Sequence, residues 1–289
     1  MSFSSRGASG RLRAALGARP ARTAVLACIV AVGSSMLTAG GDPQVASVLQ
    51  ASAVQGDPGV GALFADPTTA QHGCTGTVLD AAHDLVLTAA HCVVGTGAGM
   101  RFVPGYNGTA ADSAPFGVWS VDRVWAAAGW LAGQEPAHDL AVLQVDSQPF
   151  RGGPIRSVDQ VTGGHPVVVT RGTGDTATSA TGPVTVVAYN AGDADSAVAC
   201  TVGASVDPVP MSFNCGGYFA GTSGAPWLLK STVKHPARVV GIIGGPYQGG
   251  CTDAVSYSPS FDDQLTQLLA RAVSDLPGDD IPAAGDDGC

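Results

Sequence analysis

The chain has 289 residues, of which 45% are hydrophobic and only 13% are charged, and it contains 40 glycines and 19 prolines. A chain of this length can bury a full core, and this composition is typical of a turn-rich, all-β protein. The formal net charge is −9, and it becomes −14 once the five arginines before residue 40 are set aside. This charge argues against a nucleic-acid or anionic-membrane partner, because either one needs a basic face.

The start of the chain has the pattern of an export signal. Arginine and serine are frequent at first, and the apolar run AVLACIVAVGSSML follows over 24–37. This run is short for a membrane-spanning helix, so 1–40 is predicted to be a secretory signal peptide, with an uncleaved anchor as the alternative. A lipid on Cys28 is a second alternative, which Arg22 disfavours because it leaves almost no apolar core before that cysteine. Residues 41–58 are predicted to be a linker or a short propeptide.

From Gly59 the sequence becomes a series of short β-prone runs, which include VGALFA, HGCTGTVLD and DLVLTAAHCV. Two of the apolar runs, LVLTAAHCV at 85–93 and AHDLAVLQV at 137–145, each carry a polar group near one end, His91 or Asp139. Strands that present a base and a carboxylate in this way hold both groups rigidly. His91 and Asp139 are therefore candidate site residues.

The second half continues with short runs, after a connection rich in proline and glycine at 148–162. HPVVVTRG, PVTVVAYN, AVACTV, MSFNCGGY, WLLK and RVVGIIGG all read as strands. Leucines spaced three and four residues apart after Ser260 predict a helix over about 260–273, with acids in its first turn that suit the helix dipole. The acidic, proline- and glycine-rich tail, 275–289, is predicted to be mobile.

The stretch GGYFAGTSGAPWLL, residues 216–229, carries the candidate nucleophile, Ser223. A hydroxyl attacks a carbonyl only if its proton is taken and the resulting oxyanion meets donors. The glycines around Ser223 permit a tight turn whose N–H groups converge, so the backbone amides of Gly221 and Ser223 are the predicted oxyanion donors. The pattern G-x-S-G also occurs in ordinary turns, and it gains weight only from His91 and Asp139.

The order His91, Asp139, Ser223, within the motifs TAAHC, HDLAVL and GTSG, resembles that of the trypsin/chymotrypsin-like serine proteases, in particular their secreted bacterial branch. The resemblance runs from about residue 59 to about residue 273. It implies that His91 is the general base, that Asp139 orients it, and that Ser223 forms an acyl-enzyme.

The resemblance also implies the fold. We expect an all-β protein with two six-stranded antiparallel β-barrels, at about 59–147 and 160–259, and a C-terminal helix, in a protease domain that spans 59–274. No cofactor is expected. A metal site beside His91 is not expected either, because no second cluster of histidine and cysteine has ligand spacing.

The sequence departs from the digestive members of the family at the residue before the serine. Those members have an aspartate there, which pairs with a new N-terminus after zymogen cleavage, whereas this chain has Thr222. Activation by that ion pair is therefore not expected. Gly217, six residues before Ser223, stands where trypsin-like members place the acid that selects basic side chains, and it offers no charge.

The opposite wall of the predicted substrate pocket departs as well. The family's Ser-Trp-Gly run aligns with a Gly-Gly-Pro run, which widens the wall and removes one N–H donor. The predicted pocket residues are Gly217, Tyr218, Gly244, Gly245 and Pro246. Tyr247 and Asp253 are further candidates, and Asp253 offers a charge that would favour basic side chains.

Six of the seven cysteines remain after removal of the signal peptide, and an even number in an exported chain implies disulfides. The family resemblance implies one pair and the remaining four cysteines allow three connectivities. The predicted pairs are Cys74–Cys92, Cys200–Cys215 and Cys251–Cys289. Cys215–Cys251 is the alternative that mimics a family bridge, but Cys215 lies eight residues before Ser223 rather than four.

The sequence as a whole predicts a secreted, metal-free serine endopeptidase that acts as a monomer on protein or peptide substrates. No nucleic acid and no stable membrane partner are expected. The alternative is a catalytically silent binding module on a protease scaffold, which the unusual Gly-Gly-Pro wall suggests.

Overall fold

The structure is a computed structural model. It describes residues 49–68, 70–169, 182–192, 195–204, 210–230, 232 and 236–289. The chain divides into two units, Met1–Val45 and Ala46–Cys289, and every described residue belongs to the second. The predicted signal peptide, 1–40, lies outside the described residues. Within the described ranges, no helix has both the length and the apolar character needed to cross a membrane.

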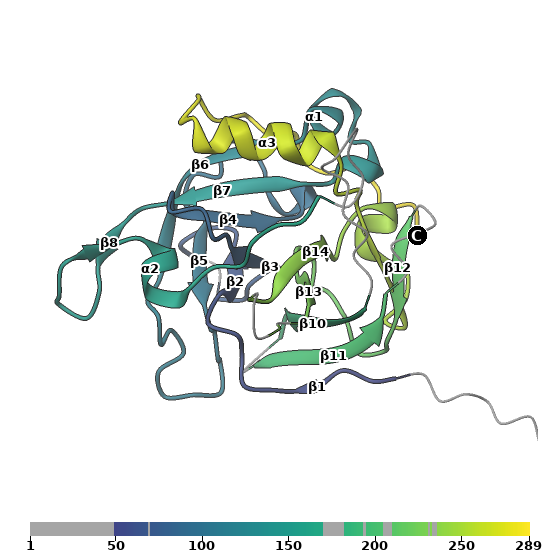
Figure 1. Ribbon diagram of the computed structural model, residues 1–289, viewed down its shortest axis with the longest axis horizontal. Helices are drawn as coiled ribbons and strands as arrows, with labels where there is room; N and C mark the ends of the chain where they lie inside the picture. Colours follow the sequence, from purple (N-terminus) through teal and green to yellow (C-terminus); the bar gives the residue numbers. More distant parts are fainter. Residues whose placement is uncertain are drawn as a thin grey trace, which may run out of the picture. The chain divides into compact units, whose positions relative to one another are not determined.

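Six strands of the first half close into an antiparallel barrel in the order β2-β3-β4-β7-β6-β5 (Figure 1). These strands are β2 (Val60–Phe64), β3 (Cys74–Val78), β4 (Leu85–Thr88), β5 (Arg101–Pro104), β6 (Trp119–Ala126) and β7 (Ala141–Val145). Side chains alternate between the two faces of a strand. Val86 of β4 accordingly packs in one core cluster with Phe102 and Trp119, whereas its neighbours Leu85 and Leu87 pack in another. The predicted six-stranded first barrel is confirmed.

The second half is more open than the first. Its strands are β1 (Ser52–Ala53), β10 (Pro183–Tyr189), β11 (Ala197–Gly203), β12 (Met211–Asn214), β13 (Pro226–Leu229), β14 (Arg238–Ile242) and β15 (Val255–Ser258). Five of them form one sheet in the order β1-β11-β10-β13-β14, and β12 and β15 form a separate two-stranded sheet. Hydrogen bonds between the described residues therefore do not close the second six-stranded barrel that the sequence predicts.

The two sheets of the second half are joined by side-chain packing, since no backbone hydrogen bonds between the described strands pair one sheet with the other. The ring of Phe213, from β12, contacts Tyr218 and Trp227 edge-on, with centroids 5.4 and 5.0 Å away. All three residues are buried in one core cluster. These rings pack the two-stranded sheet against the five-stranded one, but the second barrel is not confirmed.

The described part of the predicted linker, 49–58, packs on the second half. Strand β1 pairs with β11, and the Ala51 N–H donates to the Gly216 carbonyl over 2.8 Å. In return, the Gly216 N–H donates to the carbonyl of Leu49 over 2.7 Å. This segment is therefore an edge strand of the sheet, fixed beside the loop that leads to Ser223.

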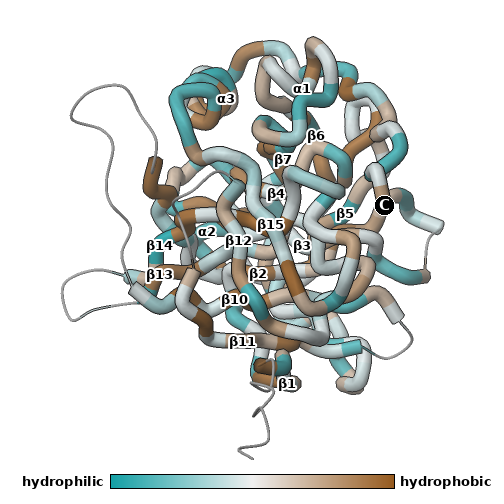
Figure 2. Tube along the Cα trace, turned by 90° about the vertical axis from the view of Figure 1, so that its right-hand side faces the viewer, coloured by the Kyte–Doolittle hydropathy of each residue, from teal (hydrophilic) through white to brown (hydrophobic). Residues whose placement is uncertain are grey.

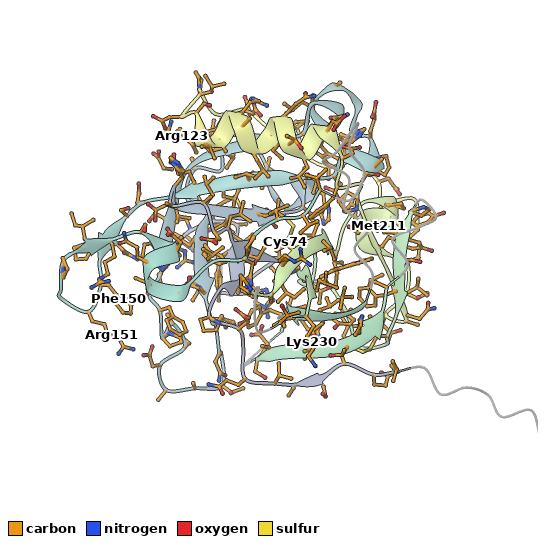
Figure 3. The ribbon with its side chains drawn as sticks, in the orientation of Figure 1. Cys74, Arg123, Phe150, Arg151, Met211 and Lys230 are labelled. Atoms are coloured by element: carbon orange, nitrogen blue, oxygen red, sulfur yellow. A yellow bond between two sulfur atoms is a disulfide. The ribbon has the colours of Figure 1, made fainter. Side chains whose placement is uncertain are left out.

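The remaining elements connect the halves and line the rim of the barrel. They are η1 (Ala90–Cys92), α1 (Ala128–Gly133), η2 (Pro136–His138), β8 (Gln148–Pro149), β9 (Ile155–Arg156), α2 (Val158–Thr162) and η3 (Pro246–Gly249). Strands β8 and β9 pair as a short hairpin, with Phe150 and Arg151 at its tip (Figure 3). The side chain of Ser157 begins α2 with a capping box to Gln160.

Helix α3 (Asp263–Val273) carries both hydrophilic and hydrophobic residues along its length (Figure 2) and packs on β6 and β7 with Leu265 and Leu268. Its N-cap is Asp262, whose side chain accepts from the Gln264 N–H, so the helix begins slightly later than predicted. The tail after α3 is not free, since Ile281 is buried and pairs with Gly95. The prediction of a mobile tail is wrong because tertiary contacts outweigh its polar composition.

Candidate active site

His91 lies at the rim of the barrel, directly after β4. The strand is entirely buried, and the chain then turns into η1, where Ala90 is fully buried and small enough to pack against the barrel. The next residue, Cys92, is bonded to Cys74 of β3. The strand before His91 and the disulfide after it fix the histidine on both sides, and only 8% of its side chain is exposed.

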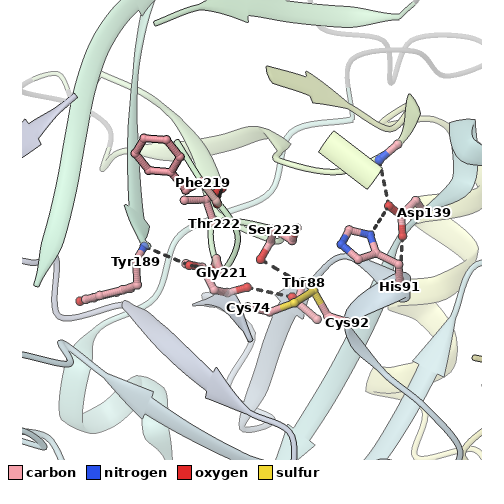
Figure 4. Close-up of a disulfide and its surroundings, with 12 residues drawn as sticks. Cys74, Thr88, His91, Cys92, Asp139, Tyr189, Phe219, Gly221, Thr222 and Ser223 are labelled. Carbon is pink, nitrogen blue, oxygen red and sulfur yellow. Dashed lines mark hydrogen bonds and ion pairs between the residues drawn. A yellow bond between two sulfur atoms is a disulfide. The ribbon is translucent and has the colours of Figure 1, made fainter. Parts of the chain in front are cut away.

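Asp139 precedes β7, the barrel neighbour of β4, in which Thr88 pairs with Ala141. This register brings Asp139 beside His91. The Asp139 carboxylate is fully buried and accepts three N–H groups: His91 Nδ1 at 2.7 Å, the His91 backbone N–H at 2.9 Å and the Gly245 backbone N–H at 2.9 Å (Figure 4). Donors of this kind replace the hydrogen bonds to water that a carboxylate loses on burial. The Nδ1–H bond leaves His91 Nε2 as the ring nitrogen that can accept a proton.

The loop that carries Ser223 is held against the first barrel. The Ser223 carbonyl accepts from the Thr75 N–H over 2.7 Å, and the Thr75 hydroxyl donates to the Gly221 carbonyl over 2.9 Å. Gly224 has a φ of +84°, and a Cβ there would overlap the Thr75 carbonyl and the Thr88 hydroxyl. Only glycine permits this close approach, so packing requires a glycine directly after Ser223.

The amides around Ser223 differ in what they bind. The Thr222 N–H and hydroxyl both donate to the Phe219 carbonyl, at 3.2 and 2.8 Å. The Thr222 side chain is therefore satisfied within its own turn. Within the described part of the chain, the N–H groups of Gly221 and Ser223 have no acceptor. These are the two amides that the sequence predicts for an oxyanion.

His91 and Ser223 line one cavity of about 340 Å³. Figure 4 shows Ser223 beside the imidazole. Among the described residues no hydrogen bond joins the Ser223 hydroxyl to the ring, and such bonds often tighten only when substrate is bound. The other residues that line the cavity are Tyr218, Phe219, Ala220, Thr222, Ile243, Tyr247, Gln248, Gly249, Gly250, Cys251, Thr252, Asp253, Ser256 and Asp287.

Of the five residues predicted for the pocket, only Tyr218 lines this cavity. Its hydroxyl donates to the Val186 carbonyl over 2.9 Å, and burial raises the pKa of the phenol above its ordinary value. Gly217 instead faces Ala51, and its carbonyl accepts from the Asn190 side chain over 3.1 Å. The cavity thus begins one residue after the position at which the family places its selecting acid.

The Gly-Gly-Pro run does not line this cavity. A Cβ at Gly244 would stand 3.1 Å from Asp139 Oδ2, and the Gly245 N–H donates to the same oxygen. The Gly244 N–H donates to the Tyr257 carbonyl, and Pro246 begins η3. Gly244 and Gly245 thus lie against the buried carboxylate of Asp139, and the segment from Tyr247 to Asp253 lines the cavity.

The structure contains all three of the expected disulfides, Cys74–Cys92, Cys200–Cys215 and Cys251–Cys289. The ligand atoms of Cys74, His91 and Cys92 lie within 4.8 Å of one another. The two sulfur atoms are bonded to each other and offer no thiolate, so this group does not fit a metal ion. Asp287 is the acidic residue of the cavity that the sequence analysis left unassigned, although the predicted Cys251–Cys289 bond pointed to its neighbourhood.

Comparison with known proteins agrees with this architecture. Residues 74–242, more than half of the chain, match the family model of the trypsin-like peptidase domain. No curated protein gives a significant match. The chain belongs to the trypsin-like peptidase family. It is a serine endopeptidase by enzyme class.

Solved structures share the fold at low identity. The protease Anisep from Arthrobacter nicotinovorans is 22% identical, with a TM-score of 0.59 over 78% of this chain and 99% of that one. The thermostable serine protease AL20 from an extremophilic microorganism is 21% identical, with a TM-score of 0.58 over 76% and 98%. A Glu endopeptidase is 17% identical, with a TM-score of 0.58 over 78% and 97%.

Proposed function

We propose that the protein is a secreted endopeptidase in which Ser223 is the nucleophile, His91 the general base and acid, and Asp139 the residue that orients His91. The observation that carries the proposal is the hydrogen bonding of Asp139. Its buried carboxylate holds both the ring and the backbone of His91, whose imidazole shares a cavity with Ser223.

Each half of the reaction moves one proton through His91. Ser223 Oγ forms a bond to the carbonyl carbon of the scissile peptide while its proton passes to His91 Nε2, and the carbonyl electron pair moves onto the oxygen. The C–N bond then breaks as His91 returns the proton to the leaving amine, which leaves an acyl-enzyme. Water repeats the same steps and releases Ser223.

Two charges develop during these steps, and the site offers a partner for each. The oxyanion meets the N–H groups of Gly221 and Ser223, which have no acceptor among the described residues. The imidazolium forms 2.7 Å from an oxygen of the Asp139 carboxylate, which also accepts from the backbone N–H groups of His91 and Gly245.

The export of this enzyme is supported by the apolar N-terminal run and by three disulfides, which are typical of oxidising compartments. We propose that it acts outside the cell as a monomer on protein or peptide chains.

Labelling with a phosphonate that reacts only with an activated serine tests the proposal. The parent protein is expected to form one adduct, at Ser223. The variant Ser223→Ala is expected to form none and to lose peptide hydrolysis by about a millionfold, because removal of the nucleophile disables the whole relay. Mass spectrometry of the tryptic peptides and a fluorogenic peptide assay measure the two effects.

Ser120→Ala is the matched control, since Ser120 is an exposed serine of β6 on the barrel. It is expected to label and cleave like the parent. A parent protein that folds with its disulfides intact but forms no adduct would favour the alternative, a silent binding module, and overturn the proposed chemistry.

A further inference from the structure

The C-terminal tail follows the first barrel after α3. The Asp279 N–H donates to the Val124 carbonyl over 2.8 Å, and the Asp279 carboxylate accepts from the Ala126 N–H over 3.0 Å. Ile281 is buried and exchanges two backbone hydrogen bonds with Gly95, at 2.8 and 2.9 Å. The tail is therefore fixed along β6 and beyond it by its backbone.

The tail then crosses to the wall of the cavity in the second half. Gln134, at the end of α1, donates to the Ala283 carbonyl over 2.6 Å and accepts from the Gly285 N–H over 2.9 Å. Gln248 of η3, which lines the cavity, donates to the Gly285 carbonyl over 2.9 Å. The two glutamine side chains hold the tail between the halves.

The disulfide Cys251–Cys289 completes this attachment, and it brings Asp287 into the lining of the cavity that contains Ser223 and His91. Asp287 Oδ1 accepts from the Cys289 N–H over 2.9 Å, which sets the carboxylate beside the disulfide. Asp253 lines the same cavity, two residues after the other half-cystine. The disulfide thus joins two segments of the chain, and each segment contributes one carboxylate to the lining of the cavity.

The charge of the cavity is one-sided as a result. Among the described residues that line it, Asp253 and Asp287 are acidic and none is a lysine or arginine. Hydroxyl groups from Thr252 and Ser256 are available as further acceptors. A guanidinium or ammonium group that enters the cavity gains charge-assisted hydrogen bonds, whereas a carboxylate meets repulsion.

We infer that the disulfide-tethered tail is a wall of the substrate pocket and that Asp287, with Asp253, is a specificity-determining residue for a cationic substrate side chain. This inference rests on the proposed function, because the cavity is the substrate site only if Ser223 is the nucleophile. The selecting charge comes from the end of the chain and from the loop after η3, whereas Gly217 contributes none.

Two peptide substrates that differ only in arginine or citrulline before the scissile bond test this inference, because citrulline is a neutral isostere of arginine. The parent enzyme is expected to show a kcat/KM for arginine at least about tenfold higher than for citrulline. Asp287→Asn is expected to lower this ratio about fivefold, because both carboxylates are exposed and one such ion pair contributes about that factor. Asparagine retains the acceptor for the Cys289 N–H, so the tail stays in place.

Asp280→Asn is the matched control, since it removes the same charge from the same tail but lines a different cavity beside Asp122. It is expected to leave the ratio unchanged. Asp253→Asn is expected to act like Asp287→Asn. The inference is wrong if the parent shows no preference for arginine, or if Asp287→Asn changes the ratio no more than Asp280→Asn.

The catalytically disabled Ser223→Ala variant separates this inference from the proposed function. Its Kd for the two peptides, measured by calorimetry, is expected to favour arginine and to lose that preference in combination with Asp287→Asn. Binding without any phosphonate labelling of the parent would reject the catalysis and retain the cationic pocket. Labelling without a charge preference would retain the catalysis and reject the role of Asp287.

Discussion

The two halves of the molecule hold their functional residues by different means. In the first half, six strands from one continuous stretch of chain close into a barrel. The pairing of β4 with β7 brings His91 and Asp139 together. In the second half, a five-stranded and a two-stranded sheet leave the backbone ladder open. Ser223 and most of the cavity wall lie there on loops, which two disulfides and the C-terminal tail hold in place.

This difference follows the needs of the chemistry. The proposed base, His91, and its carboxylate, Asp139, require a geometry fixed to a few tenths of an ångström, which a closed ladder supplies. The cavity must instead fit a side chain of the substrate, and loops vary in sequence without disturbing a barrel. In the second half, the disulfides Cys200–Cys215 and Cys251–Cys289 fix the segments that strand pairing does not hold.

Within the barrel, the largest effect is expected at Asp139. Asp139→Asn is expected to lower kcat by about 10⁴-fold, because an amide cannot hold the Nδ1–H tautomer and stabilise the imidazolium together. The loss of a charged acceptor for three N–H groups is also expected to cost about 1–3 kcal/mol in the free energy of unfolding. Single-turnover kinetics and denaturant unfolding measure the two effects.

Asp146→Asn provides the comparison, since Asp146 is exposed just beyond the other end of β7. It is expected to keep both kcat and stability. If Asp139→Asn retained activity within tenfold of the parent, the Asp139 carboxylate would not be what orients His91.

The next effect concerns the disulfides of the two halves. Cys74–Cys92 and Cys200–Cys215 span similar separations of 18 and 15 residues, so removal of either one is expected to cost about 3 kcal/mol through the unfolded chain. Their local effects are expected to differ. Cys74 lies in a strand paired on both sides, whereas Cys200–Cys215 links β11 of one sheet to the end of β12 in the other.

Hydrogen exchange in the two double alanine variants measures this difference. Without Cys200–Cys215, the amides of β12 and β15 are expected to exchange through a local opening that costs less free energy than global unfolding. Without Cys74–Cys92, the amides of the barrel are expected to exchange only through global unfolding. Equal local opening in both variants would contradict the contrast between a closed and an open half.

The same contrast explains what the sequence could predict. The barrel strands are local features that short apolar runs predict, and His91 and Asp139 each stand near one end of such a run. The cavity wall depends on contacts between distant residues, such as Gln248 with Gly285, 37 residues apart. Only the pairing of Cys251 with Cys289 left a trace of this contact in the sequence.

The absence of Gly244 and Gly245 from the lining of the cavity has a related cause. Alignment with a family motif gives the position of a glycine along the chain. It does not say which neighbouring group the glycine backbone approaches. Here the missing side chains let the backbone approach the Asp139 carboxylate. The composition of the acidic tail predicts that it is mobile. The buried side chain of Ile281 and the hydrogen bond of the Asp279 carboxylate instead fix it on the barrel.

The smallest effect is expected at the junction of the halves, where His165 lies between Asp57, before β2, and Ala237, before β14. Its two ring nitrogens lie 3.1 Å from Asp57 Oδ1 and 3.2 Å from the Ala237 carbonyl. Burial alone would lower the pKa of His165, but the hydrogen bond and charge of Asp57, with a contribution from Asp80, raise it above 6.5. Burial likewise opposes the shift at Asp57, whose pKa is nevertheless lowered by His165.

A raised pKa in the folded state means that the charged imidazole stabilises the fold fully below pH 6.5 and that this stability is lost as the pH rises through the folded pKa. The lowered pKa of Asp57 contributes stability above about pH 4, which is lost only as the pH falls through its folded value. His165→Gln is therefore expected to cost about 1 kcal/mol near pH 5.5 and less at pH 9. Melting temperatures across this range, with the exposed His83→Gln as control, measure the difference. An equal loss at both pH values would mean that His165 joins the halves by packing and not by its charge.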